Sequence, residues 1–251
     1  MPKIKAITFD LWDTILRDDS DEPKRKAAGR PTKKEERREL VHRFCSAHGQ
    51  IAREVVNRVY DTADAAFNKV WKERHVTWTV RERLEIVIRG LGRDLPDIEF
   101  AELVRLHEEM ELEFRPDVVP GAAEALKRLH ETCRLGVISD AIFTPGRALR
   151  MILSDAGLLG YFELFFFSDE TGRSKPDPLA FQHAIETFGI KPAELVHIGD
   201  REHNDIDGPH RAGARAVLCT AAIDRGSAGT RAEAVFGDYR ELPDIIDSIN
   251  R

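Results

Sequence analysis

The sequence predicts an α/β protein: a Rossmann-like three-layer core with a parallel sheet, into which an α-helical bundle is inserted. Three observations support this fold class. A short apolar run, AITF, stands near the start of the chain and is typical of a buried strand. Helical periodicity alone then continues for about 80 residues. After Pro116, short apolar runs alternate with amphipathic segments, which is the pattern of parallel strands joined by helices.

The first strand is expected at residues 4–9, and a highly charged segment follows it. Residues 23–38 read PKRKAAGRPTKKEERR and contain eight Lys or Arg and two Glu, a balance of +8 − 2 = +6. Because this segment shows no strand pattern, we expect a solvated and mobile lead-in. The alternative is a basic lip that attracts an anionic substrate.

Four amphipathic helices are expected next. Two of them begin at capping boxes, in which a threonine is followed three residues later by a glutamate: TKKE at Thr32 and TVRE at Thr79. Apolar residues recur along one face of each segment. Four such helices with short connections predict a small helical bundle. The expected ranges are 32–48, 51–74, 79–92 and 98–114.

The rest of the chain alternates between strands and helices. Strands are expected at 133–140, 162–167, 195–198 and 216–219, and helices at 120–131, 146–156, 178–188, 205–212 and 242–249. This alternation predicts a parallel sheet that is covered on both faces. Since the first strand belongs with this half, we predict a core made of residues 1–17 and 117–251 and an inserted helical domain of residues 18–116.

The bulk composition argues against some classes of function. The net charge is −6 and the pI about 5.9, whereas nucleic-acid-binding proteins usually carry a basic excess. The three cysteines form no C-x-x-C pair, so we expect free thiols in a reducing compartment. The sequence shows neither a signal-peptide pattern nor a run of about 18 apolar residues. We therefore expect a cytoplasmic protein without nucleic-acid or membrane partners; the sequence gives no indication of oligomeric state.

Polar side chains follow several of the expected strands. They are Asp10, Ser139, Asp200, Asp205 (one helical turn after Asp200) and Lys175, which stands just before a helix. In an open α/β sheet, the carboxyl ends of the strands meet in one crevice, where ligands bind. Crowded carboxylates repel one another, and a hard divalent cation such as Mg2+ resolves that conflict. The pattern therefore predicts a Mg2+ site, with the Lys175 ammonium offsetting the negative charge of nucleophile and substrate.

Four short motifs, FDLWDT, VISD, SKPDP and HIGDREHND, occur in this order and resemble those of the haloacid dehalogenase superfamily of hydrolases. The helical insertion lies where members of that family carry a C1-type cap. The resemblance implies that Asp10 is a nucleophile that attacks phosphorus and forms an aspartyl-phosphate. It also implies that Thr14 and Ser139 bind the transferring group and that Lys175 orients Asp10. Asp140, which ends the second motif, is expected to bind substrate together with Ser139 and Lys175.

The same resemblance implies a Mg2+ cofactor and a small, phosphorylated substrate. The metal ligands would be Asp10, the backbone carbonyl of Trp12, Asp200 and Asp205, the last directly or through water. Such a site suits phosphoryl transfer, which depends on positioning and charge neutralisation. A carboxylate nucleophile divides the hydrolysis into two steps.

One position departs from the phosphatases of this family. They usually carry a second aspartate, which acts as a general acid, where Trp12 stands. Asp13 lies one residue later, where an extended backbone directs its side chain to the opposite side. We expect Asp13 to be a loop or capping acid, and the alternative is a displaced general acid. Without such an acid, substrates whose leaving groups are weak bases should react best.

A Mg2+-dependent phosphatase is the function that we expect, with two alternatives. The 2-haloacid dehalogenases also carry an aromatic residue at the Trp12 position and form an aspartyl ester, since halide needs no proton to leave. Against them stand the phosphatase-type metal motif of Asp200, Asn204 and Asp205, and Phe181 in place of a tyrosine. The second alternative is a catalytically weakened protein of this fold with a binding role.

Overall fold

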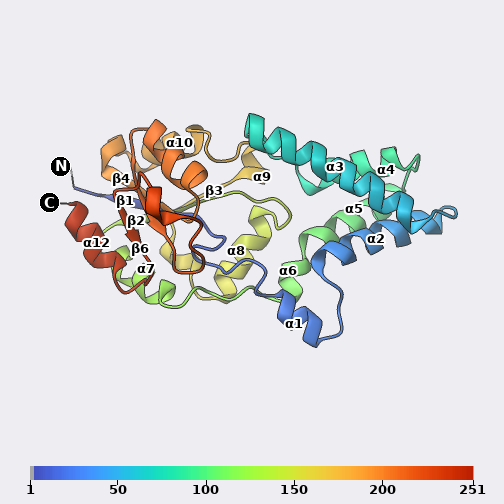
Figure 1. Ribbon diagram of the computed structural model, residues 1–251, viewed down its shortest axis with the longest axis horizontal. Helices are drawn as coiled ribbons and strands as arrows, with labels where there is room; N and C mark the ends of the chain where they lie inside the picture. The colour runs from blue at the N-terminus through green and yellow to red at the C-terminus, as the bar shows by residue number, and fades with distance from the viewer. Residues whose placement is uncertain (1–2, 251) are drawn as a thin grey trace.

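The computed structural model describes residues 3–250, and within them a six-stranded parallel sheet forms the centre of the α/β core (Figure 1). The strand order is β3-β2-β1-β4-β5-β6. This sheet and its flanking helices confirm the predicted fold class. The strands are β1 (Ala6–Phe9), β2 (Arg134–Ser139), β3 (Leu164–Phe167), β4 (Leu195–Gly199), β5 (Arg215–Cys219) and β6 (Ala234–Phe236).

β1 lies in the middle of the sheet and pairs on both sides. Phe9 is level with Val137 of β2 and with Ile198 of β4, and the N–H of Asp10 donates to the Ile198 carbonyl at 2.8 Å. All four residues of β1 are buried, which explains why this strand is apolar except for Thr8, whose hydroxyl bonds to His197. The register brings the carboxyl ends of β1, β2 and β4 to the same edge of the sheet.

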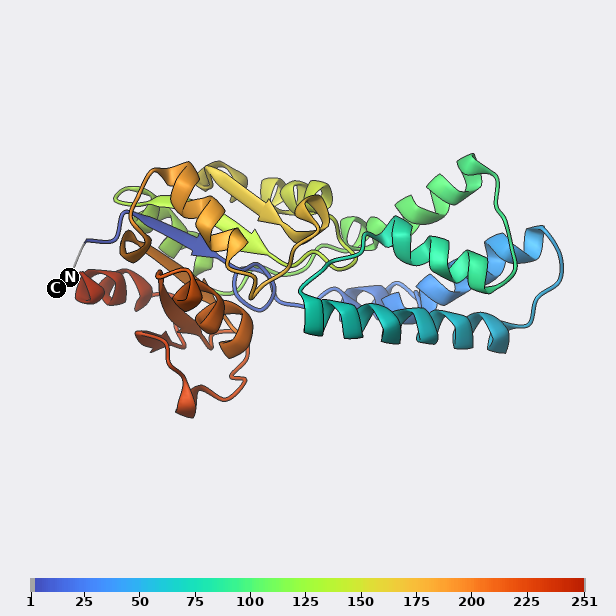
Figure 2. The same cartoon turned by 90° about the horizontal axis from the view of Figure 1, so that it is seen from above.

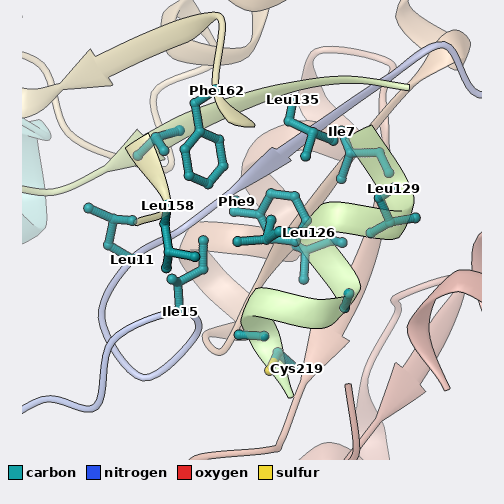
Figure 3. Close-up of a cluster of buried hydrophobic side chains, with 14 of the residues drawn as sticks. Ile7, Phe9, Leu11, Ile15, Leu126, Leu129, Leu135, Leu158, Phe162 and Cys219 are labelled. Atoms are coloured by element: carbon teal, nitrogen blue, oxygen red, sulfur yellow. The ribbon is translucent and has the colours of Figure 1, made fainter. Parts of the chain in front are cut away.

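Helices cover both faces of the sheet, and alternate β1 side chains point to opposite faces. Ile7 and Phe9 pack with Leu126 and Leu129 in the cluster drawn in Figure 3, whereas Ala6 belongs to the cluster on the other face. The helices of the first face are α7 (Ala122–His130), α8 (Gly146–Asp155) and α12 (Leu242–Ile249); those of the second are α10 (Leu179–Phe188) and α11 (Asp207–Arg211). The core also contains α9 (Ser168–Thr171) and short turns at Leu159–Tyr161, Pro192–Glu194, Glu202–Ile206 and Ser227–Gly229.

The chain between β1 and α7 forms the predicted helical insertion, which lies beyond the carboxyl edge of the sheet (Figures 1 and 2). Both predicted capping boxes are present, at Thr32 and at Thr79. The helices share an apolar cluster of their own, which contains Leu40, Leu84 and Leu103. They are α1 (Glu22–Ala27), α2 (Lys33–Ala47), α3 (Arg53–Arg74), α4 (Val80–Gly90), α5 (Asp97–Glu108) and α6 (Met110–Glu113). That residues 18–116 form a separate domain stays a prediction.

The charged segment 23–38 is not the solvated lead-in that we expected. It forms α1 and the start of α2, and three of its basic residues are buried: Arg25 is 0% exposed, Lys33 5% and Arg37 7%. Long basic side chains become buried when their charges find partners and their alkyl stems find apolar contacts. Arg25 pairs with Glu36 and lies over the Phe114 ring. Because Phe114 lies far along the chain from Arg25, this contact is not visible in the local pattern.

Two further elements differ from the prediction. β6 was not expected, since a strand of three residues is too short to show periodicity. The single helix expected at 98–114 is divided into α5 and α6, with the break at Glu109.

Cys45, Cys133 and Cys219 are all buried and free, in agreement with the expected thiols. Within residues 3–250, no helix combines the length and the apolar character that crossing a membrane would require.

Candidate active site

A cavity of about 310 Å³ lies where the carboxyl edge of the sheet meets the helical insertion. Its lining combines residues that are distant in the sequence, and it contains four of the nine predicted site residues. The core contributes Asp10, Trp12, Asp140, Lys175, Arg201 and Asn204. Residues 18–116 contribute Asp18, Asp19, Lys33, Arg37, Trp71 and Glu111.

Asp10 follows β1 directly and is held from two neighbouring elements. Its Oδ1 accepts a hydrogen bond from the Ser139 hydroxyl at 2.8 Å and lies 2.8 Å from the Lys175 Nζ. Ser139 is the last residue of β2, the neighbouring strand in the sheet. Both contacts use the same carboxylate oxygen, so the other oxygen, Oδ2, is left for attack on an electrophile.

Lys175 is buried between two carboxylates. Its Nζ lies 2.8 Å from Asp10 and 2.6 Å from Asp205. Burial alone would lower the pKa of Lys175, but Asp10 and Asp205 outweigh this effect and raise it. The side chain therefore remains a cation in contact with Asp10; that it orients Asp10 and offsets the negative charge of nucleophile and substrate stays a prediction.

Asp205 is fully buried, and both of its oxygens are engaged. Oδ1 accepts from Lys175 and from His197 Nε2 at 3.2 Å, and Oδ2 accepts from the Arg201 N–H at 2.9 Å. His197 Nδ1 lies 2.9 Å from the Thr8 hydroxyl, which donates to it when Nε2 carries the ring proton. Burial of Asp205 would raise its pKa, but Lys175 and His197 lower it, so this carboxyl stays ionised.

His197 was not predicted as a site residue. The sequence contained a signal, because this histidine is a polar residue inside the otherwise apolar strand LVHIG. Burial lowers its pKa, so the ring is neutral and donates to Asp205 without adding charge.

Asp200 ends β4 and carries an unsatisfied oxygen. Its Oδ2 accepts from the Arg225 guanidinium, whereas its buried Oδ1 accepts no hydrogen bond among the described residues and lies 3.9 Å from the Arg201 Nε. Burial, together with Asp10 and Asp205, raises the pKa of Asp200 to about 7. One carboxylate oxygen each from Asp10, Asp200 and Asp205 lie within 4.8 Å of one another. This acidic, partly unsatisfied donor set fits a hard divalent cation such as Mg2+.

Asp205 reaches this group from an unexpected element. The expected helix at 205–212 is preceded by a wide, π-type turn over Glu202–Ile206, and α11 begins only at Asp207. The turn folds Asp205 back onto the end of β4. A Cβ atom on Gly199 would lie only 2.3 Å from the Asp205 Cγ, so the approach depends on glycine at this position.

The loop after β1 does not bring Asp13 into the cavity. Its φ is +52°, its Oδ2 lies 2.6 Å from the Arg225 Nη2, and its Oδ1 accepts from the Asp18 N–H. These contacts describe a loop acid, so the geometry does not support the displaced general acid. Trp12 does line the cavity. Thr14 is buried with its hydroxyl unpartnered in the described chain, and its role in binding the transferring group stays a prediction.

Asp140 lies on the cavity wall, but its two oxygens link parts of the protein. Oδ1 accepts from the Lys175 backbone N–H at 2.9 Å, and Oδ2 accepts from the Asn204 amide at 3.2 Å. Burial raises the pKa of Asp140 to about 7 against the opposing effect of Lys175. The contacts show Asp140 positioning the Lys175 loop, and substrate binding by Asp140 stays a prediction.

The chain matches the model of one protein family, and it is similar to several proteins that are named as phosphatases. A family model described as haloacid dehalogenase-like hydrolase matches residues 4–213. The chain is 39% identical over 94 residues to a phosphoserine phosphatase of Thermus thermophilus, covering 36% of each protein. It is 37% identical over 143 residues to a glyceraldehyde 3-phosphate phosphatase of Pyrococcus furiosus, covering 53% of this chain and 55% of that protein. A phosphoglycolate phosphatase of Thiobacillus denitrificans is 41% identical over 75 residues, or 30% of this chain and 33% of that protein.

These alignments cover between a third and just over half of the length of the relatives. Two solved structures resemble the fold over almost the whole chain. A 2-haloacid dehalogenase from Pseudomonas syringae superposes with a TM-score of 0.66 at 22% identity, covering 98% of this chain and 99% of that one. A phosphatase from Thermococcus onnurineus gives 0.65 at 22% identity, covering 99% and 100%. At this level of identity the two structures agree on the fold alone.

Proposed function

Because this chain belongs to the haloacid dehalogenase-like hydrolases, we propose that it is a Mg2+-dependent phosphatase that acts on a small phosphorylated metabolite. The relatives that are named as phosphatases support this reaction class. The single observation that carries the proposal is the convergence of Asp10, Asp200 and Asp205, whose carboxylate oxygens lie within 4.8 Å of one another beside the Lys175 ammonium. A nucleophile, a cation and a set of oxygen ligands are the parts that phosphoryl transfer needs.

In the proposed reaction, Oδ2 of Asp10 attacks phosphorus, and the bond between phosphorus and the leaving oxygen breaks. Water then attacks the phosphorus of the aspartyl-phosphate, which releases inorganic phosphate and restores the carboxylate. Ser139 and Lys175 hold Oδ1 and so keep the attacking oxygen in place. The Lys175 ammonium offsets the charge of nucleophile and phosphoryl group. A magnesium ion held by Asp10, Asp200 and, directly or through water, Asp205, with the Trp12 carbonyl, would polarise the phosphoryl oxygens.

We infer that the helical insertion, residues 18–116, serves as a cap. It provides five of the nine charged residues that line the cavity, from the loop after β1, α2 and α6, and α3 adds Trp71. A cap of this kind excludes water during the reaction and selects the leaving group.

The proposed enzyme lacks a general acid at the usual place. Trp12 lines the cavity where that acid is expected, and Asp13 is bound to Arg225. A general acid typically contributes about 10²–10⁴-fold to the rate. Aryl and acyl phosphates, whose leaving groups are weak bases, should therefore be hydrolysed faster than alkyl phosphates.

Phosphate release provides the test. We expect p-nitrophenyl phosphate and acetyl phosphate to be hydrolysed with Mg2+ and not after chelation. Asp10→Asn should lower this activity by at least about 10³-fold. Asp244→Asn, at an exposed aspartate on α12, is the matched control and should retain it. Activity that persists in Asp10→Asn would contradict the proposed nucleophile.

The dehalogenase alternative rests on Trp12, because an aromatic residue lines the cavity in place of the acid. Halide release from 2-chloropropionate should be measured beside phosphate release. Halide release that needs no metal would favour the dehalogenase. If neither product appears across a broad panel, a binding role becomes the better reading.

A further inference from the structure

Charged side chains of the helical insertion line the cavity that contains Asp10, and the proposed phosphoryl transfer uses none of them. They belong to the loop after β1, to α2 and to α6. Arg37 is the positive group without a carboxylate partner. The negative groups are Asp18, Asp19 and Glu111. They outnumber the one ammonium group beside them, that of Lys33.

Arg37 is a buried cation without an anion. It is 7% exposed, its Nε is buried with no hydrogen-bond partner, and no carboxylate in residues 3–250 forms an ion pair with it. Its guanidinium lies 3.6 Å from the centre of the Phe143 ring, which stabilises a cation but does not neutralise it. Burial lowers the pKa of Arg37, as expected for a desolvated cation. A buried charge of this kind is costly unless something pairs with it.

Arg83 shows that the same surroundings can satisfy a guanidinium. It lies on the same ring, 4.0 Å from the centre of Phe143. It forms an ion pair with Asp64 at 2.7 Å and donates to the Ile142 carbonyl at 3.0 Å. Arg83 does not line the cavity of Asp10, whereas Arg37 does. The missing partner of Arg37 is therefore best supplied by a molecule in the cavity.

The negative side of the lining is also unbalanced. Lys33 lies 2.7 Å from Glu111, 2.8 Å from Asp21 and 3.2 Å from Asp19, so one ammonium faces three carboxylates. Glu111 is 5% exposed, and its Oε2 is buried without a partner among the described residues. Burial and the neighbouring Asp19 raise the pKa of Asp18, which also lines the cavity, to about 6. This end of the cavity is therefore short of positive charge.

Both imbalances are resolved by a substrate that carries both signs of charge. We infer that the cavity takes a phosphate monoester whose alcohol part bears a carboxylate and an ammonium group, as O-phosphorylated α-amino acids do. The carboxylate would pair with Arg37, and the ammonium with Glu111 and Asp18. Lys33 and Arg37 lie one turn apart on α2, where the Cβ atoms of such neighbours are about 5–6 Å apart, and Glu111 of α6 is bound to Lys33. The unpaired cation and the unbalanced carboxylates therefore line the same cavity.

This inference rests on the proposed phosphatase activity. A panel of four phosphate monoesters tests the preference for a doubly charged substrate separately from that activity. O-phosphoserine carries both charges, phosphoglycolate only the carboxylate, O-phosphoethanolamine only the ammonium, and glycerol 3-phosphate neither. We expect kcat/KM for O-phosphoserine to exceed that of each other substrate by about tenfold or more, which corresponds to 1.4 kcal/mol.

Two substitutions should then act on different substrates. Arg37→Met should lower the ratio of kcat/KM for O-phosphoserine and phosphoglycolate, relative to glycerol 3-phosphate, by about 10–100-fold, the loss of a charge-assisted pair. Glu111→Gln should lower the ratio for O-phosphoserine and O-phosphoethanolamine instead. Asp18→Asn, which breaks no ion pair in the described chain, is a second variant for the ammonium should Glu111→Gln fold poorly.

Matched controls come from the same helices. Arg43→Met removes an exposed guanidinium of α2 that also stacks on a phenylalanine, Phe44, and Glu113→Gln removes an exposed carboxylate of α6. Both should leave the substrate ratios unchanged.

Three results separate the possible failures. Equal kcat/KM for all four substrates, or substitutions that lower all of them alike, would overturn the inference while the phosphatase stands. If Glu111→Gln lowers the melting temperature and leaves the substrate ratios unchanged, these acids serve folding, and the inference is overturned as well. If no substrate releases phosphate, the phosphatase proposal fails, and calorimetry of Asp10→Asn with the four compounds decides whether the preference for both charges exists in binding.

Discussion

At the scale of single residues, the site depends on how buried charges are balanced. Asp205 is ionised because Lys175 and the neutral His197 ring both stabilise its charge. Asp200 accepts from the Arg225 guanidinium on one oxygen, and its other oxygen lies 3.9 Å from the Arg201 Nε and accepts no hydrogen bond in the part of the chain described here. The two acids thus differ in their need for a further cation. This difference suits Asp200 as a direct ligand of the proposed metal ion, while Asp205 also holds Lys175 in place.

Trp12 offers a direct test at the same scale. We predict that Trp12→Asp raises kcat for glycerol 3-phosphate by about 10–100-fold, because an alkoxide leaving group needs the proton that this acid can donate. The rate with p-nitrophenyl phosphate should change far less, since its leaving group is a weak base. Steady-state kinetics with both substrates provide the measurement. Trp12→Asn is the control, because asparagine has nearly the size of aspartic acid but cannot act as an acid. An equal rise of kcat in the Asn and Asp variants would show that removal of the indole, and not proton donation, causes the effect.

At the scale of elements, the sequence predicts what local contacts decide. α2 and α4 begin where their capping boxes predict, because Thr32 and Thr79 bond to residues three positions away. The wide turn at Glu202–Ile206 was not predicted, because it is stabilised by contacts of Asp205 with Lys175 and with β4. Residues 23–38 were misjudged for the same reason, since contacts such as those of Arg25 with Phe114 and of Lys33 with Glu111 join segments far apart in the sequence.

Gly199, the last residue of β4, allows the Asp205 side chain to approach the end of this strand. We predict that Gly199→Ala lowers the free energy of unfolding by about 1–3 kcal/mol, because the added Cβ would meet the Asp205 side chain at 2.3–2.6 Å and displace it. Phosphatase activity should fall with it, since Asp205 holds Lys175. Chemical denaturation and phosphate release are the measurements. Gly160→Ala adds the same methyl group where nothing lies within 4 Å, so a comparable loss there would rule out the steric explanation.

At the scale of the whole molecule, the cavity exists because two parts of the chain meet. The four motifs could be placed at one sheet edge from the sequence, since the carboxyl ends of parallel strands converge. The pairing of the insertion with the core could not, because contacts such as that of Arg37 with Phe143 join residues far apart in sequence. The charge of the cavity follows from such contacts, which explains why the sequence indicates the hydrolase family but not the substrate.

Arg83 is one buried connection between these two parts. It belongs to α4 of the insertion, donates to the Ile142 carbonyl in the loop after β2, and pairs with Asp64 of α3. We predict that Arg83→Met weakens this connection by about 1–3 kcal/mol, since a buried carbonyl and a carboxylate lose their donor. The free energy of unfolding should fall, and KM should rise more than kcat falls, because the insertion would be held less firmly over the cavity.

Arg147 provides the comparison for that prediction. It also joins the two parts, through ion pairs with Glu108 and Glu109 at 2.7 and 2.8 Å, but its side chain is 48% exposed. Exposed pairs of this kind contribute about 0–1 kcal/mol, because water competes for both charges. Arg147→Met should therefore change stability and KM little. If the two variants behave alike in denaturation and in kinetics, burial of the Arg83 contact is not what holds the insertion in place, and the apolar contacts of Phe143 with the helices of the insertion become the better explanation.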